Sequence, residues 1–95
     1  MVKVIGKGLE GLAKFIDECF EKGGVPTFVA EYGGVTLHDK VIVRCYGVGR
    51  GFGGTIVDVP KDVIELILRS RNDWKKLVEY LRARGFTIPH APSVP

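Results

Sequence analysis

The chain contains no glutamine and a single asparagine, Asn72, whereas charged residues make up 26% of it. Few thermolabile amides together with many Lys, Arg and Glu are typical of proteins from hyperthermophiles, which we therefore expect as the source. The sequence has no apolar run of about 18 residues that could form a transmembrane helix. Its N-terminus lacks the long apolar stretch of a signal peptide. We expect a cytoplasmic protein without a membrane partner.

The chain has only two cysteines, Cys19 and Cys45, too few for a framework of several disulfides or a cysteine-rich metal site. Cys19 falls on the apolar face of a helical pattern, and Cys45 alternates within a strand pattern. We expect both to serve as small buried hydrophobic side chains. The alternative, a disulfide between them, would join a helix to the sheet.

Residues suited to catalysis are scarce. His38 precedes Asp39 in an expected turn, His90 lies in a proline-rich tail, and the acidic residues lack the spacing of a two-metal site. The glycine-rich segment 47–54 leads into a strand rather than a helix, and the chain has no Gly-Lys-Ser/Thr, which excludes a dinucleotide fold and a P-loop. We expect no enzyme activity, metal or cofactor; a small RNase with His38 as its base is the remaining catalytic alternative.

The charges are distributed unevenly along the chain. Residues 1–39 contain four Lys against six Asp or Glu, whereas residues 40–95 contain ten Lys or Arg against five, which gives the net charge of +3. A basic half on a small domain suits a polyanionic partner, because Lys and Arg neutralise phosphates. The charge pattern therefore favours nucleic acid among the possible partners.

The hydrophobic pattern predicts one α+β domain over residues 1–88 and a proline-rich, mobile tail over residues 89–95. The predicted order is an N-terminal helix, about four antiparallel strands in a meander, and two C-terminal helices packed on the sheet. Apolar residues at i, i+3 and i+4 place the first helix at residues 9–22. Alternation and turn signals place the strands at residues 27–32, 35–37, 41–46 and 55–59. Pro60 and Gly85 bound the helix pair.

The most informative segment is 44–55, which places two arginines and two aromatic rings among five glycines. Arg44 and Tyr46 share a strand face opposite a core face, and Arg50 and Phe52 follow in the glycine-rich loop. Arginine pairs with phosphates, and aromatic rings stack on bases. The segment therefore predicts contact with single-stranded nucleic acid. The alternative is that Tyr46 lies under the helices with the Arg44 stem packed over it.

The second C-terminal helix offers another basic and aromatic surface. Lys76, Tyr80 and Arg84 follow one another at i, i+4 and i+8, and Lys75 lies on a neighbouring basic row. Trp74 is expected to anchor the core, and to stack on a base only if the helices and the sheet leave a cleft. The alternative is a solvated helix face with Tyr80 at the edge of the core.

Residues 25–86 combine a glycine-punctuated strand block, the turn Asp58-Val-Pro and a helix pair that contains Asn72-Asp-Trp-Lys-Lys-Leu. This organisation resembles the DNA-binding domain of the archaeal ThermoDBP family in element order, composition and size. The resemblance implies sequence-unspecific binding of single-stranded DNA, and also of RNA, in a cleft between sheet and helices. It also implies dimers or higher oligomers, and it transfers no individual functional residue.

These features together predict binding of single-stranded DNA or RNA in a basic groove lined by aromatic rings, without catalysis. We also expect a homo-oligomer, either a dimer or a tetramer. The alternative from a different class is a homo-oligomeric interaction module in which the aromatic strand face meets another copy. The predicted nucleic-acid contacts are Arg44, Tyr46, Arg50, Phe52, Trp74, Lys75, Lys76, Tyr80 and Arg84.

Overall fold

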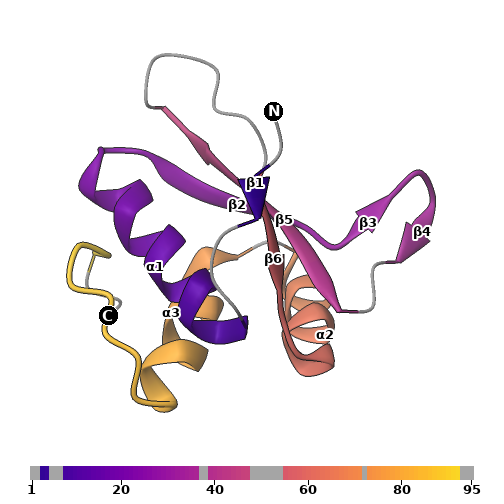
Figure 1. The fold of residues 1–95 in the computed structure, drawn as a ribbon. Helices are drawn as coiled ribbons and strands as arrows, with labels where there is room; N and C mark the ends of the chain where they lie inside the picture. The colour runs from indigo at the N-terminus through magenta and orange to yellow at the C-terminus, as the bar shows by residue number, and fades with distance from the viewer. Residues whose placement is uncertain (1–2, 5–7, 37–38, 48–54, 72, 93–95) are drawn as a thin grey trace.

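The computed structural model describes residues 3–4, 8–36, 39–47, 55–71 and 73–92 (Figure 1). One helix follows the short first strand and precedes the other strands, and two helices follow them, which confirms the predicted α+β class. The first helix begins and ends within one residue of its predicted bounds. The elements in chain order are β1 (Lys3–Val4), α1 (Gly8–Glu21), β2 (Val25–Val29), β3 (Glu31–Tyr32), β4 (Val35–Thr36), β5 (Lys40–Tyr46), β6 (Thr55–Asp58), α2 (Lys61–Ser70) and α3 (Trp74–Ala83).

The main sheet has the strand order β1-β6-β5-β2. β2, β5 and β6 are antiparallel neighbours, and the short β1 joins β6 in parallel. β3 and β4 form a separate two-stranded ribbon, which projects away from the helices (Figure 1). The structure thus differs from the predicted meander, because the strand expected at residues 27–32 is divided at the buried Ala30. The predicted hairpin at Gly33-Gly34 does form, with the positive φ angles that such a turn requires, but it closes the ribbon outside the sheet.

All three helices cover the same face of the main sheet (Figure 1). In β5, Val41, Val43 and Cys45 are buried, while the residues between them are half-buried or exposed. Since successive strand side chains point to opposite faces, one face belongs to the core shared with the helices. The opposite face carries no helix in the described part of the chain. None of the described helices combines the length and the apolarity that crossing a membrane requires.

The ends of the C-terminal helices follow from particular residues. α2 begins after Pro60 and ends at Ser70, and its C-cap Arg71 has a left-handed φ of 55°. The carboxylate of Asp73 accepts a hydrogen bond from the backbone N–H of Lys75 at 3.0 Å and caps α3. The helix ends before Gly85, whose φ of 89° is easily adopted only by glycine. The predicted stop at Gly85 is therefore confirmed, and Asp73 caps the helix just after the break expected at residues 70–72.

The segment after α3 packs on α1. Ile88 is 1% exposed, and Ala91 is also buried. The backbone N–H of His90 donates to the carboxylate of Asp17 at 2.8 Å. Residues 89–92 thus contribute to the domain, whereas a mobile tail had been expected from residue 89 onwards. The burial of Ile88 and Ala91 in the core and the hydrogen bond to Asp17 of α1 explain the difference.

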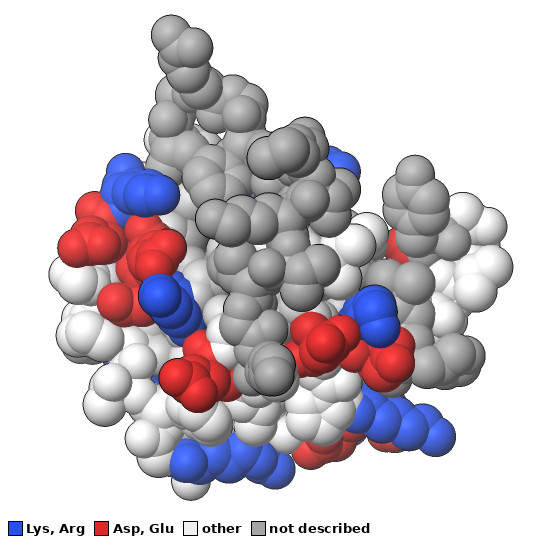
Figure 2. All heavy atoms as spheres, in the orientation of Figure 1, with Lys and Arg blue, Asp and Glu red and all other residues white. Residues whose placement is uncertain are grey.

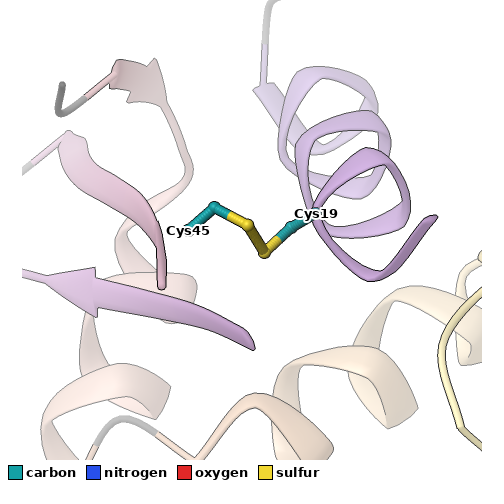
Figure 3. Close-up of a disulfide and its surroundings, with 2 residues drawn as sticks. All are labelled: Cys19 and Cys45. Carbon is teal, nitrogen blue, oxygen red and sulfur yellow. A yellow bond between two sulfur atoms is a disulfide. The ribbon is translucent and has the colours of Figure 1, made fainter. Parts of the chain in front are cut away.

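Cys19 of α1 and Cys45 of β5 form a disulfide between the helical layer and the sheet (Figure 3). Their Cα atoms are 5.6 Å apart, and the two residues are 3% and 4% exposed. The prediction of burial is confirmed, but the expectation of two separate hydrophobic side chains is wrong. The pairing depends on how the end of α1 lies over the end of β5, which local periodicity does not specify.

Candidate nucleic-acid interface

The sheet face turned away from the helices, here called the outer face, carries side chains of three strands. Tyr46 is 55% exposed, Val25 is 47% exposed, and Arg44 is also exposed, while the other members are half-buried. This pattern excludes the alternative in which Tyr46 lies under the helices. The members are Val25, Thr27 and Val29 of β2, Ile42, Arg44 and Tyr46 of β5, and Ile56 of β6.

The strand register arranges the outer face in rows. Directly opposed residues of antiparallel strands have Cβ atoms about 4.5–5.5 Å apart, so the members of a row touch. One end row combines an aromatic ring with a valine, the middle row is polar, and the other end row is apolar. The rows are Tyr46 with Val25, Arg44 with Thr27, and Ile42 with Val29 and Ile56.

The opposite end of β5 carries a cation that is already paired. The Lys40 ammonium lies 3.4 Å from a carboxylate oxygen of Asp58 and 3.5 Å from one of Asp39. The hydrogen bond with Asp58 and the charges of both carboxylates raise the pKa of Lys40 above its ordinary value. With one cation against two carboxylates, this end of the sheet carries a net negative charge and does not favour an anionic ligand.

Arg44 and Tyr46 form the end of the outer face that can bind an anion. None of the described carboxylates forms an ion pair with Arg44. Its planar guanidinium suits a phosphate, and the exposed ring of Tyr46 offers a stacking surface for a base. The two side chains can therefore hold one phosphate and one base on the same strand.

A second arginine–tyrosine pair, on α3, is engaged within the protein. The Tyr80 hydroxyl donates to a carboxylate oxygen of Asp62 at 2.5 Å, and a guanidinium nitrogen of Arg84 lies 3.5 Å from the same oxygen. The guanidinium carbon of Arg84 lies 3.7 Å from the centre of the Tyr80 ring. Partial burial and the hydrogen bond with Asp62 raise the pKa of the Tyr80 phenol. Because Asp62 belongs to α2, this cluster ties α2 to α3.

Trp74 anchors the helical layer. Its ring meets the ring of Phe20 edge to face, with 4.7 Å between the centroids, and it is half-buried against the core. The ammonium of Lys75 lies 5.9 Å from the centre of the Trp74 ring. Lys76 is exposed on the same helix. The expected core-anchoring role of Trp74 is therefore confirmed.

The structure divides the predicted contacts between two surfaces. Arg44 and Tyr46 lie on the outer face, whereas Trp74 and the residues that follow it belong to the helical layer behind the sheet (Figure 1). The described residues of these two surfaces do not line a common groove. In Figure 2 basic and acidic side chains are interspersed on the face that is shown. Arg50 and Phe52 lie outside the described residues.

Sequence reasoning missed the carboxylates that engage predicted contacts. Asp62 is 18 positions away from Tyr80, so no local pattern signals their pairing. Asp17 is likewise distant in sequence from His90, whose ring nitrogen Nδ1 lies 3.0 Å from its carboxylate. Within the described ranges, no group of His, Cys, Asp and Glu is arranged to hold a metal ion.

Comparisons with protein-family models, curated protein sequences and solved structures find no significant match to this chain. The resemblance to the ThermoDBP family therefore stays a prediction. The function is inferred from the residues and their geometry alone.

Proposed function

We propose that this protein binds single-stranded nucleic acid, DNA or RNA, without sequence preference, catalysis or a cofactor. The observation that carries the proposal is the exposure of Arg44 and Tyr46 at neighbouring outward positions of β5. Aromatic rings on an open sheet face are a common platform for unpaired bases, and basic side chains beside them hold the backbone. The outer face combines both features at one end.

The spacing on the strand suits a nucleotide. Two outward side chains of one strand are separated by about 6.6 Å, so Arg44 can hold a phosphate while a base stacks on Tyr46. Thr27 lies beside Arg44 and adds a hydroxyl, and Val25 lies beside Tyr46 and extends the apolar surface. Stacking accepts every base because every base has a π face, which explains the expected lack of sequence preference.

The remaining predicted contacts have secondary roles. The exposed Lys75 and Lys76 add positive potential around the helical layer. Tyr80 and Arg84 contribute less, because Asp62 already engages both of them. Trp74, Arg50 and Phe52 stay predicted contacts.

Fluorescence anisotropy with labelled single-stranded DNA of mixed sequence tests the proposal, with the same sequence as RNA and as a duplex for comparison. We expect single strands to bind with an affinity that falls as salt rises, and the duplex to bind weakly. Tyr46→Ala should weaken binding by about fivefold or more, because one stacked base contributes about 1–3 kcal/mol. Leu68→Ala changes another exposed side chain, on α2, and should leave binding unchanged. Absence of binding at low salt, or unchanged binding by Tyr46→Ala, contradicts the proposal.

A second candidate function is self-association through the outer face. The observation that favours it is the apolar character of the row of Ile42, Val29 and Ile56 together with the 47% exposure of Val25. Arg44 opposes it, because a face-to-face dimer would bury a charge for which no described residue supplies a partner. Light scattering with Val25→Lys distinguishes the two functions: self-association through this face predicts a wild-type oligomer that becomes a monomer in the variant.

We further propose a cytoplasmic location in a hyperthermophilic archaeon and assembly into a homo-oligomer. Disulfides are rare in the cytosol of mesophiles but frequent in intracellular proteins of hyperthermophiles. The Cys19–Cys45 bond and the scarcity of amide side chains are both compatible with such a source.

A further inference from the structure

The Cys19–Cys45 disulfide lies directly behind the Arg44–Tyr46 pair. Cys45 stands between the two binding residues in β5, and its side chain points to the opposite face of the sheet. There it is bonded to Cys19 in the last turn of α1 (Figure 3). The bond therefore fixes to the helical layer the residue that lies between Arg44 and Tyr46.

The end of β5 that carries the pair is held by β2 and by the disulfide. Among the described residues, β5 pairs with β6 as far as Val43. Within the described residues, Arg44, Cys45 and Tyr46 pair with β2 alone. The residue opposite Cys45 is Pro26, which has no backbone N–H to donate. The disulfide thus adds a covalent link to the helical layer at the end of the strand that carries Arg44 and Tyr46.

Three chain segments meet at the disulfide: the end of α1, the start of β2 and the end of β5. The backbone N–H of Gly24 donates to the carbonyl of Cys19 at 2.9 Å, which holds the turn between α1 and β2. Gly47, which follows β5, lies against the same turn. A change at the disulfide therefore reaches the position of Tyr46 through the backbone on both sides of Cys45.

We infer that the Cys19–Cys45 disulfide positions Arg44 and Tyr46 for binding, so that affinity for single-stranded nucleic acid depends on the oxidation state of the two cysteines. This inference rests on the proposed function. Side chains that are ordered before binding spare the complex the entropy cost of immobilising them. The oxidised protein is therefore the form that binds more tightly.

Dithiothreitol can supply the reducing step. One thiolate of the reagent attacks a sulfur of the pair, which forms a mixed disulfide and releases the other cysteine. The second thiol of the reagent closes its ring and releases the remaining cysteine. The reagent loses two electrons and two protons, and Cys19 and Cys45 gain them as thiols. Because both sulfurs are buried, the reagent needs transient opening of the junction, so reduction is done at elevated temperature and verified by thiol titration.

The test measures affinity for labelled single-stranded DNA of mixed sequence with oxidised, reduced and re-oxidised wild type and with Cys19→Ala/Cys45→Ala. Each form is assayed at a temperature at which circular dichroism shows it folded. Reduction and the double substitution should each weaken binding about tenfold, and re-oxidation should restore it. Amide hydrogen exchange should accelerate at residues 44–46 but not at residues 41–43. Val63→Ala, a buried substitution in α2, should leave both affinity and this exchange difference unchanged.

The outcomes separate this inference from the proposed function. If the oxidised protein binds and the reduced, folded protein binds equally well, the positioning role is wrong while the proposed function stands. If the oxidised protein does not bind, the proposed function fails and hydrogen exchange alone decides the structural part of the inference. Faster exchange confined to residues 44–46 then supports positioning of the strand end, whereas uniform or absent acceleration overturns it.

Discussion

The protein contains two arginine–tyrosine pairs whose surroundings differ. On α3, Arg84 stacks on Tyr80, and the carboxylate of Asp62 engages both. On β5, Arg44 and Tyr46 point outward from a sheet face without a helix, and no described carboxylate neutralises the arginine. The same two residue types thus form an internal tie in one region and an available surface in the other.

The difference shows that a carboxylate from a neighbouring element decides the role of such a pair. Asp62 comes from another helix, so its effect appears only once α2 and α3 are packed together. The two pairs also differ in how they are attached to the rest of the domain. Cys45 links the β5 pair covalently to α1, whereas the α3 pair is held by hydrogen bonding, charge and stacking.

The largest loss of stability is expected when the disulfide behind Arg44 and Tyr46 is removed. The disulfide joins positions 26 apart in the sequence, and chain entropy over such a loop contributes about 3.5 kcal/mol to the free energy of unfolding. Cys19→Ala/Cys45→Ala should lose about this amount in denaturant unfolding. Comparison with reduced wild type isolates the covalent bond from the change in side-chain volume. A loss below about 1 kcal/mol in both would show that the two layers hold together without the bond.

Substituting the two tyrosines in turn should separate their roles. Tyr80→Ala should lower the free energy of unfolding by about 1–2 kcal/mol, because it removes packing and the hydrogen bond to Asp62. Tyr46→Ala, at a 55% exposed position, should change stability by less than about 0.5 kcal/mol. Chemical unfolding measures both values. The comparison breaks down if Tyr46→Ala proves the more destabilising of the two.

Removing the carboxylate from the α3 pair should make it resemble the β5 pair. Asp62→Asn deletes the charge that neutralises Arg84, at a cost of about 1 kcal/mol in stability. The freed cation should raise affinity for single-stranded DNA modestly and steepen its dependence on salt. Glu65→Gln, an exposed change on the same helix, supplies the matched control. Equal affinities for the two variants would mean that Arg84 is not restrained by Asp62.

The smallest effect on stability is expected from a substitution in the C-terminal segment, which belongs to neither arginine–tyrosine pair. The hydrogen bond with Asp17 and the charges of Asp17 and Glu21 raise the pKa of the His90 imidazole, although desolvation opposes them. Since the folded-state pKa lies above the ordinary value of 6.5, the stabilisation is complete below that pH and is lost as pH rises through the folded-state pKa. His90→Ala should remove this pH dependence of stability without changing DNA affinity. If the unfolding midpoints of the wild type and of His90→Ala vary identically with pH, this role of His90 is contradicted.

The sequence predicted those parts of the fold that depend on local pattern. The i, i+3, i+4 spacing located α1, and the alternation of Val41, Val43 and Cys45 correctly assigned the two faces of β5. The same alternation placed Arg44 and Tyr46 on one surface. These predictions succeed because hydrophobic periodicity reports burial directly.

Features that depend on contacts distant in sequence were not predicted. The strand predicted at residues 27–32 is divided into β2 and β3 because Ala30 is buried. The disulfide depends on the placement of α1 over β5. The hydrogen bond from the Tyr80 hydroxyl to Asp62 forms only when α2 packs on α3. In each case the sequence supplies suitable residues, but the packing of whole elements selects the partner.

The most direct measurement is a titration of isotope-labelled protein with single-stranded DNA, followed by the chemical shifts of the backbone amides. Our interpretation predicts that the largest changes occur at residues 44–46 of β5 and at the opposed Val25 and Thr27 of β2. Changes centred on residues 76–84, in α3 and at its C-cap, with β5 unaffected, would contradict it. So would the absence of any change at low salt.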